Sequence, residues 1–269
     1  MDNSFKTNPV LAVYWVQGLS KQEKPLEKAI EMDITNRFWR AVIKRLEEGS
    51  GDRSGIHVTD LVYDCLRRAY YDKKLGDLVS AVSDSEGLMV VWIGQMLHEM
   101  PIDPVSCEHE KEIEIEFDGV RVEGRVDEAC RIGDSYVVID KKSSRAIPNV
   151  PHDHHIKQVL FYSAILSKRY GYRVSHVGVL YLDVANLKTK LFLIPVSIQM
   201  LEVALRELER KAKALSQALQ SNTPPLPDPG WLCSYCPYFK KCVMDGWGTA
   251  VVDIVKEQLP IRNGAGSSG

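Results

Sequence analysis

The sequence predicts an α/β fold in which helices flank a mixed β-sheet. Two groups of strand-like segments, separated by a helix-like segment, are the first indication. The predicted strands are Glu108–Phe117, Val120–Cys130, Tyr136–Ile139, Ser175–Asp183 and Thr189–Val196. The second indication is that helical patterns also precede and follow these strands, an order typical of a sheet covered by helices.

Apolar residues recur at helical spacing in five segments. We expect helices at Lys24–Glu48, from about Thr59 through Cys65 to Lys74, at Asp84–Glu99, at Ile156–Arg169 and from Ser197 to about Ser221. Thr59 is a suitable N-cap. The helix at Asp84–Glu99 is so apolar that we expect it to be largely buried. The last helix has a heptad-like apolar seam, for which packing on its own domain is favoured over contact with another subunit or partner.

Length and charge set wide limits on function. The chain has 269 residues, 45% of them hydrophobic, which is enough for one large domain or a domain with an appendage. The formal net charge of -2 gives no global basic field, although metal ions and local patches can still neutralise phosphates. The sequence has no apolar run near 18 residues and a poor signal-peptide pattern at its start. We therefore expect a cytoplasmic protein without membrane association.

Acidic and basic residues stand where two predicted strands end. Asp127 lies on Val120–Cys130, and Asp140 and Lys142 follow the apolar run Tyr136–Ile139. Because side chains alternate along a strand, Asp140 and Lys142 point to the same face. Two close carboxylates repel unless a cation lies between them, and oxygen ligands suit Mg²⁺ or Mn²⁺. Taken alone, these residues are explained equally well by a surface ion pair.

A cluster of cysteines near the C-terminal end indicates a metal centre. Cys233, Cys236 and Cys242 are spaced C-x2-C-x5-C, and three thiolates so close together need a cation. A fourth ligand could come from Cys65, Cys107 or Cys130. From chemistry alone a structural zinc is at least as well supported as an iron–sulfur cluster. Six cysteines in a cytosolic protein suggest metal or redox chemistry sooner than disulfides.

Four short motifs follow one another in the order found in a known nuclease superfamily. They are G-x-x-x-H (Gly94, His98), G-x-x-D (Gly124, Asp127), D-x-K (Asp140, Lys142) and Q-x-x-x-Y (Gln158, Tyr162). Together they resemble the PD-(D/E)XK nuclease core in its RecB-type branch. Each motif is weak singly, but their order makes the set specific.

The cysteine pattern narrows the resemblance. One cysteine before the nuclease motifs and three after them are similar to the iron–sulfur RecB-type nucleases, and above all to the CRISPR-associated Cas-four exonucleases. The resemblance covers about residues 56 to 244 and implies a restriction-endonuclease-like fold. It implies an iron–sulfur cluster, [4Fe–4S] rather than [2Fe–2S], that joins the N- and C-terminal parts through four ligands: Cys65, Cys233, Cys236 and Cys242. Cys107 and Cys130 have no counterpart and are expected to be packing residues.

The resemblance also implies a domain division. Residues 1–50 would form an N-terminal helical extension, residues 51–247 the nuclease domain with its cluster, and residues 248–269 a tail. The Gly/Ser-rich residues Asn263–Gly269 would be partly disordered or derived from cloning. The sequence leaves open whether the protein forms a homo-oligomer.

The same resemblance assigns roles to the motif residues. Mn²⁺ or Mg²⁺ would be held by His98, Asp127, Asp140 and the backbone carbonyl of Lys141. Lys142 would complete the catalytic set by orienting or deprotonating the attacking water. Gln158 and Tyr162 would position the DNA strand or Lys142. We also considered two other groups of residues: Glu112 or Glu114, which could approach the metal, and His152, His154 and His155, which we do not expect to be ligands.

The implied function is metal-dependent, single-strand DNA exonuclease activity, from 5′ to 3′, that leaves 5′-phosphate and 3′-hydroxyl ends. Its role would be to trim precursor spacers for the CRISPR adaptation integrase, so its partners would be DNA with single-stranded regions and the integrase proteins. One alternative is a stand-alone RecB-type repair nuclease, which fits the absence of a G-x-x-x-x-G-K-[ST] phosphate loop. A second is a non-catalytic DNA-binding subunit of the integrase complex.

Overall fold

A computed structural model describes residues 32–34, 37, 40, 54–75 and 85–247. The chain divides into two compact units, Met1–Gly49 and Ser50–Gly269, and the fold described below belongs to the second. The predicted helix at Lys24–Glu48 lies almost entirely outside the described residues, as does the predicted tail at 248–269. The proposed division into three segments therefore stays a prediction.

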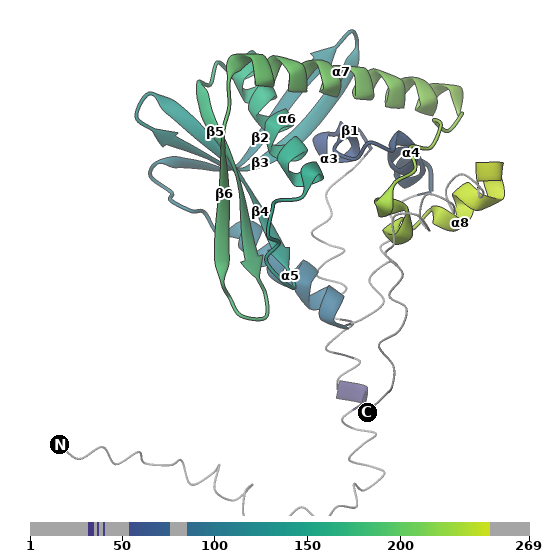
Figure 1. The fold of residues 1–269 in the computed structure, drawn as a ribbon, viewed down its shortest axis with the longest axis horizontal. Helices are drawn as coiled ribbons and strands as arrows, with labels where there is room; N and C mark the ends of the chain where they lie inside the picture. Colours follow the sequence, from purple (N-terminus) through teal and green to yellow (C-terminus); the bar gives the residue numbers. More distant parts are fainter. Residues whose placement is uncertain (1–31, 35–36, 38–39, 41–53, 76–84, 248–269) are drawn as a thin grey trace, which may run out of the picture. The chain divides into compact units, whose positions relative to one another are not determined.

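A six-stranded mixed sheet forms the centre of the fold (Figure 1). Its strands are β1 (Ile56–His57), β2 (Cys107–Phe117), β3 (Val120–Ile132), β4 (Ser135–Ser144), β5 (Val174–Asp183) and β6 (Thr189–Pro195). The strand order is β1-β3-β4-β5-β6, and β2 runs along β3. The β1/β3 and β4/β5 pairs are parallel, whereas β2/β3, β3/β4 and β5/β6 are antiparallel. The predicted mixed sheet is confirmed.

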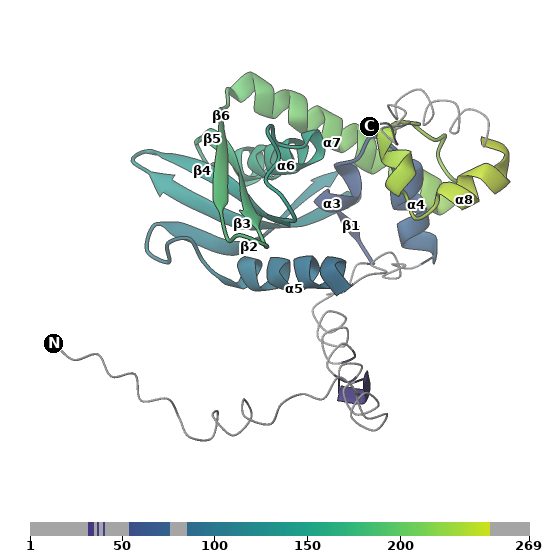
Figure 2. The same cartoon turned by 60° about the horizontal axis from the view of Figure 1, so that its bottom comes forward.

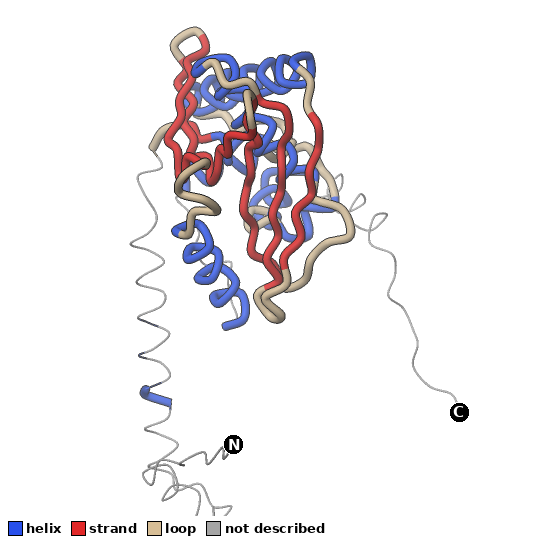
Figure 3. The backbone as a smooth tube through the Cα atoms, turned by 90° about the vertical axis from the view of Figure 1, so that its left-hand side faces the viewer, coloured by secondary structure: helices blue, strands red, loops and turns tan. Residues whose placement is uncertain are grey.

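Helices cover both faces of this sheet. They are α3 (Val58–Leu61), α4 (Leu66–Leu75), α5 (Ser85–Glu99), α6 (Asp153–Tyr170), α7 (Ile198–Ser221) and α8 (Phe239–Cys242), with short helical turns η2 (Trp231–Tyr235) and η3 (Val243–Trp247) around α8. Figure 2 shows α5 on one side of the sheet and α6 and α7 on the other, and Figure 3 shows strands of the sheet side by side with helices around them. Within the described part of the chain, no helix combines the length and apolarity needed to cross a membrane.

Helix α5 is less buried than its composition predicts. The side chains of Val91 and Met96 are 41% and 48% exposed. The reason is that α5 is an outer layer, which among the described elements packs mainly against β4 (Figure 2). The expectation that this helix is largely buried was wrong.

Helix α7 packs back on its own domain, as predicted. Ser197 caps its N-terminus by accepting a hydrogen bond from the backbone N–H of Met200 at 3.3 Å. Its inner face packs against α6 and α4. The buried residues on that face are Leu201, Ala204, Leu208, Lys211, Ala212, Leu215 and Ala218. The apolar seam is thus used inside the domain.

The helix predicted to run from about Thr59 through Cys65 is broken into α3 and α4. Cys65 lies in the break, and His57 rather than Thr59 occupies the N-cap position. A buried lysine of α7 accounts for the break, because Lys211 Nζ donates to the backbone carbonyls of Leu61 at 3.0 Å and Tyr63 at 2.9 Å. A charged partner satisfies carbonyl groups that a continuous helix would have bonded internally. The predicted continuous helix was therefore wrong.

Candidate active site

The two predicted carboxylates lie side by side at the centre of the sheet. Glu128 on β3 pairs with Ile139 on β4, so the antiparallel register brings Asp127 next to Asp140. Asp140 is fully buried and Asp127 is 5% exposed. Lys142 Nζ lies 2.8 Å from Asp140 Oδ1, and the backbone N–H of Lys141 donates to Asp127 Oδ2 at 2.6 Å. The strand register therefore brings the acid–acid–lysine set together.

His98 reaches the same place from the end of α5. Its Nδ1 atom lies 3.2 Å from Asp127 Oδ1. The helix can lie this close to β4 because residue 94 is glycine: a Cβ atom there would lie 2.7 Å from Ser143 Oγ. Ser143 in turn donates to the backbone carbonyl of Val90 at 3.0 Å. The glycine of G-x-x-x-H thus allows the close packing that places the histidine.

Gln158 and Tyr162 support the carboxylates from α6. Gln158 Nε2 donates to the Tyr162 hydroxyl at 3.1 Å, and both side chains are buried. A Cβ atom at Gly124 would lie 2.9 Å from Tyr162 Cε1, so the tyrosine ring occupies the space that the missing side chain leaves. The glycine of G-x-x-D is therefore needed for the packing of Tyr162. Burial suits these two residues to a positioning role better than to direct contact with DNA.

The protonation equilibria of the site reflect burial opposed by close opposite charges. Burial raises the pKa of Asp140 to about 6, although Lys142 acts to lower it. Burial also acts to raise the pKa of Asp127, but the contact with His98 brings it below its ordinary value. Burial disfavours the charged forms of His98 and Lys142, yet the nearby carboxylates raise the pKa of His98 to about 9 and raise that of Lys142. In the metal-free protein, protons on His98 and Lys142 balance the carboxylates.

Glu110 is a site residue that the sequence did not reveal. It lies on β2 between His109 and Lys111, which pair with Glu128 and Val126; it has a positive φ of 48° and places Oε1 3.6 Å from His98 Nδ1. That oxygen is buried without a hydrogen-bond partner. Glu112 and Glu114, the residues we had considered, are exposed instead. Several glutamates alternate along this strand, and only the register with β3 distinguishes Glu110 from the others. The sequence does not show that register.

The donors fit a divalent cation. One ligand atom each from His98, Glu110 and Asp127 lies within 4.8 Å of the other two. The set combines carboxylate oxygens with an imidazole, which suits Mg²⁺, Mn²⁺ or related ions. In the part of the chain that the structure describes, Glu110 Oε1 makes no hydrogen bond and has only His98 within ion-pair distance, so a cation held there would give this buried oxygen a further partner.

Comparison with known proteins identifies the fold family. The family model described as the PD-(D/E)XK nuclease superfamily matches residues 41–243. This chain belongs to the PD-(D/E)XK nuclease superfamily. Comparison with curated protein sequences finds no match. The predicted nuclease core is thereby confirmed at the level of the superfamily, whose members use divalent metals.

One solved structure supports the same fold. The crystal structure of SSO0001 aligns with a TM-score of 0.52 and 23% identity, covering 78% of this chain and 95% of SSO0001. At this identity the likeness shows the fold alone. A crystal structure of a protein assigned as an exonuclease from Eubacterium rectale aligns with a TM-score of 0.35 and 11% identity, covering 83% of this chain and 82% of that protein.

Four free cysteines of this superfamily member approach one another. They are Cys65 before α4, Cys233 in η2, Cys236, and Cys242 at the end of α8. Burial raises the pKa of Cys242 and of Cys236, and neighbouring cysteines raise both further. A single zinc with Zn–S bonds of about 2.3 Å would hold thiolates roughly 3.8 Å apart. Among the described residues, no three of these cysteines have sulfur atoms within 4.8 Å of one another.

The other two cysteines overturn a prediction. Cys107 and Cys130 face each other across β2 and β3 and form a disulfide. They are therefore not simply packing residues, and the preference against disulfides was wrong for this pair. The physical reason is the register of the two strands, which places the side chains of directly paired residues close enough to bond.

The side chain of Lys141 has a structural role in addition to the metal-binding role predicted for its backbone carbonyl. Its side chain is 1% exposed, and Nζ donates to Glu128 Oε1 at 2.9 Å and to the backbone carbonyl of Met100 at 2.8 Å. The carbonyl of His98 lies 3.4 Å away. Lys141 therefore holds the C-terminal end of α5, which carries His98, from the face of the sheet opposite Asp140 and Lys142.

Three histidines stand near Lys142 at the start of α6. Tyr181 links two of them, since its hydroxyl lies 2.7 Å from His155 Nδ1 and accepts from the backbone N–H of His152 at 3.1 Å. Burial and the charge of Lys142 lower the pKa of His155 to about 2, and burial together with His152 lowers that of His154 to about 4. These histidines are not among the close groups of metal-ligating atoms in the described part of the chain.

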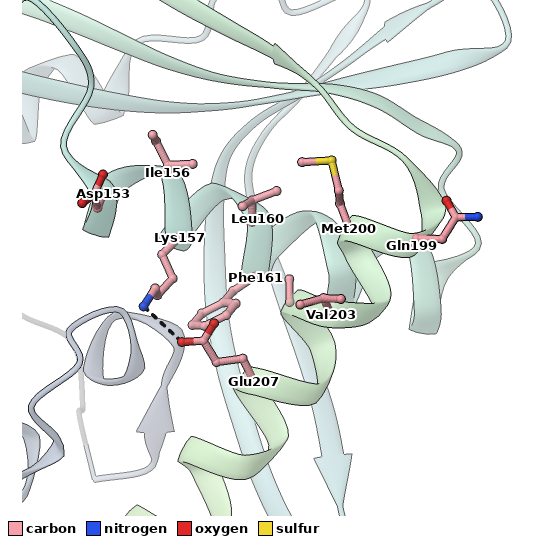
Figure 4. Close-up of a pocket in the computed structure, with 10 residues that line it drawn as sticks. Asp153, Ile156, Lys157, Leu160, Phe161, Gln199, Met200, Val203 and Glu207 are labelled. Carbon is pink, nitrogen blue, oxygen red and sulfur yellow. Dashed lines mark ion pairs between the residues drawn. The ribbon is translucent and has the colours of Figure 1, made fainter.

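An apolar pocket of about 470 Å³ lies between α6 and α7 (Figure 4). Ile156, Leu160 and Met200 line it, and Lys157 pairs with Glu207 at 3.0 Å on its rim. None of the predicted site residues lines this pocket. We therefore place the candidate active site at the carboxylates of β3 and β4.

Proposed function

We propose that this superfamily member is a divalent-metal-dependent deoxyribonuclease. The observation that carries the proposal is the convergence of His98, Asp127, Asp140 and Lys142 from α5, β3 and β4. These residues are far apart in the sequence. The first three carry an imidazole and two carboxylates, which are groups that bind metal ions. Two nearly buried carboxylates side by side are unfavourable in a protein that merely binds DNA. This argues against a non-catalytic subunit.

The residues divide the work of phosphodiester hydrolysis. His98, Glu110, Asp127 and Asp140, with the backbone carbonyl of Lys141, would hold the cation. When bound, Mg²⁺ or Mn²⁺ supplies a Lewis acid for the phosphate and lowers the pKa of a water molecule. Lys142 keeps a proton on Nζ beside Asp140, so it can orient the nucleophile and balance negative charge as it develops. Gln158 and Tyr162 keep the surrounding side chains in place.

We infer the substrate and the pathway from the motifs and cysteines. The substrate we propose is single-stranded DNA, or DNA with single-stranded overhangs, digested from the 5′ end. The biological role we propose is trimming of precursor spacers together with the CRISPR adaptation integrase. A stand-alone DNA-repair nuclease has the same active site and is the second candidate. The four free cysteines, which converge on one place, favour the iron–sulfur branch in either case.

Digestion of end-labelled DNA tests the catalytic proposal. We expect anaerobically purified protein with Mn²⁺ to shorten single-stranded DNA, and to release the 5′ label before the 3′ label. Lys142→Met should reduce the rate by about a hundredfold or more, since it removes a charge at the reacting phosphate. Lys190→Met, at an exposed lysine on β6, is the matched control and should retain the rate. Full activity in Lys142→Met, or DNA binding without cleavage by the wild type, would contradict the proposal.

The identity of the cysteine-bound group needs a separate measurement. We expect brown protein with visible absorption, and iron and sulfide in equal amounts, as in an iron–sulfur cluster. Cys65→Ser should remove most of the absorption. A colourless protein that contains zinc would show that the four cysteines bind zinc instead.

A further inference from the structure

Two neighbouring cross-strand pairs line one face of the β2–β3 ladder. Cys107 pairs with Cys130, and His109 pairs with Glu128. Their side chains point to the same side, because the disulfide joins the first pair and His109 Nδ1 lies 2.9 Å from Glu128 Oε1 in the second. Asp127 precedes Glu128 in the strand and so points to the other face. The cluster therefore lies behind the candidate active site and is separate from it.

Glu128 has an unused oxygen in this cluster. The residue is fully buried, and its Oε1 atom receives Lys141 Nζ at 2.9 Å and the backbone N–H of Ile102 at 3.1 Å. Its Oε2 atom is buried without any hydrogen-bond partner. A disulfide has no proton to donate, so it cannot satisfy a carboxylate. A buried oxygen left without a partner is unfavourable and indicates that another group occupies this place in some state of the protein.

The available donors identify that group. The sulfur atoms of Cys107 and Cys130 and one carboxylate oxygen of Glu128 lie within 4.8 Å of one another. Two thiolates and a carboxylate match the ligands of Zn²⁺, whereas Mg²⁺ and Ca²⁺ prefer oxygen alone. We propose that Cys107, Cys130 and Glu128 form a Zn²⁺ site that is closed by the disulfide and opened by its reduction. The inference does not rest on the proposed nuclease activity.

The charges of the surroundings suit this ion. Two thiolates and a carboxylate carry three negative charges, and Zn²⁺ leaves one of them uncompensated. Lys141, 1% exposed and in contact with Glu128, supplies the matching positive charge. A neutral assembly avoids the large penalty of burying net charge. His109 orients Glu128 from the opposite strand, and the fourth position at the metal is left for water.

The switch between the two states is a thiol–disulfide exchange. Cys107 is partly exposed whereas Cys130 is buried, so the Cys107 sulfur is the one that we expect a reductant to attack. A thiolate of an external dithiol attacks this sulfur, breaks the S–S bond and forms a mixed disulfide. The second thiol of the reductant then releases Cys107. Two electrons and two protons pass to Cys107 and Cys130 while the dithiol becomes a disulfide, and Zn²⁺ binding releases the two thiol protons.

Alkylation of single cysteines tests the site without any substitution. The full chain is reduced with a phosphine, freed of reductant under anaerobic conditions, and treated with iodoacetamide with and without Zn²⁺. Peptide mass spectrometry then follows Cys107 and Cys130 separately from the other four cysteines. We expect Zn²⁺ to slow alkylation of both by about tenfold or more, because a metal-bound thiolate is a poorer nucleophile. Equal alkylation with and without Zn²⁺ would overturn the proposal.

Metal counting and matched variants sharpen the result. Reduced wild type should bind one more Zn²⁺ per chain than the oxidised protein, and Cys107→Ser/Cys130→Ser should show no such difference. Glu128→Gln should lose the protection of Cys107 and Cys130. The matched control is Glu116→Gln, at an exposed glutamate on β2, the strand that carries Cys107, and it should keep that protection. An extra Zn²⁺ that persists in the cysteine double variant would also refute the site.

Discussion

At the scale of single residues, the candidate active site is defined by two carboxylates that are buried, although burial disfavours their charged forms. Asp140 is fully buried, and its pKa is raised to about 6 even with Lys142 at 2.8 Å. Asp127 remains ionised more easily because His98 and the backbone N–H of Lys141 contact it. The metal-free site therefore depends on protonated His98 and Lys142 for charge balance, and a divalent cation could take over that role.

The protonation of His98 predicts a pH dependence of stability in the metal-free protein. The folded-state pKa is about 9 against an ordinary 6.5, so its stabilising effect is complete below pH 6.5 and is lost as pH rises through 9. With EDTA present, we expect the free energy of unfolding to fall over this range by on the order of 1–2 kcal/mol, after allowance for the partly exposed ring.

Urea unfolding at several pH values measures this dependence. His98→Asn should flatten the decrease between pH 6.5 and 9, because no imidazolium is left to lose its proton. The comparison of the two slopes removes contributions from other groups that titrate in the same range. An unchanged slope in His98→Asn would show that its contact with Asp127 does not stabilise the fold.

At the scale of elements, the seating of α5 on β4 determines where the histidine lies. Gly94 permits the close approach, Ser143 bonds to the carbonyl of Val90, and Lys141 binds carbonyl groups beyond the end of the helix. The β4 residues that make these contacts, Lys141 and Ser143, are two apart and so lie on the same face of the strand. A single strand thus supplies Asp140 and Lys142 on one side and the support for α5 on the other.

A steric substitution and its rescue test the seating of α5. Gly94→Ala places a Cβ atom 2.7 Å from Ser143 Oγ, so the helix or the serine must move. We expect this variant to bind Mn²⁺ about tenfold more weakly, because small displacements of a ligand and its support typically have effects of this size. Adding Ser143→Ala removes the clashing oxygen and leaves Ser143 Cβ at 3.6 Å as the nearest atom.

Calorimetric titration with Mn²⁺ compares the four proteins. We expect the double variant to recover most of the affinity, and Ser143→Ala alone to stay near the wild-type value. Weak binding that persists in the double variant would mean that Gly94 acts in another way, for instance through the flexibility of the helix.

At the scale of the whole molecule, the C-terminal cysteine segment is fastened to α4. Arg67 donates to Asp245 Oδ2 at 2.6 Å and to the backbone carbonyl of Pro225 at 2.9 Å, although 178 residues separate it from Asp245. The Tyr71 hydroxyl also donates to Asp245, and the Tyr71 and Tyr238 rings are 5.4 Å apart. These contacts bring Cys65 towards Cys233, Cys236 and Cys242 before any metal binds.

Removal of the buried arginine should loosen this connection. Arg67 is 4% exposed, but its partner Asp245 is 23% exposed and keeps Lys241, so loss of the arginine should destabilise the fold by about 1–3 kcal/mol. We expect Arg67→Met to lower the free energy of unfolding by this amount and to reduce the iron content of the purified protein. Arg121→Met, which breaks exposed pairs with Glu114 and Glu123, is the control and should change stability by less than about 1 kcal/mol. Equal effects of the two variants would show that Arg67 does not fasten the segment.

The parts of the fold that could be predicted from the sequence depend on local patterns. The alternation in Glu108–Phe117 and the apolar run before Asp140 define strands wherever they pair, and the superfamily match confirms the nuclease core that the motifs indicated. Asp140 and Lys142 lie on the same face because side chains alternate between the two faces of a strand, and this too follows from the sequence alone. These features require no knowledge of which strand lies next to which.

The remaining features were decided by partners that are distant in the sequence. Glu110 and the Cys107–Cys130 disulfide depend on the register between β2 and β3, and a shift of one residue would turn every side chain to the other face. The break at Cys65 depends on Lys211, 150 residues after Leu61, whose Nζ satisfies the freed carbonyl groups. Local residue patterns determine which elements form, whereas register and buried charge pairing, which only the folded chain establishes, determine which side chains meet.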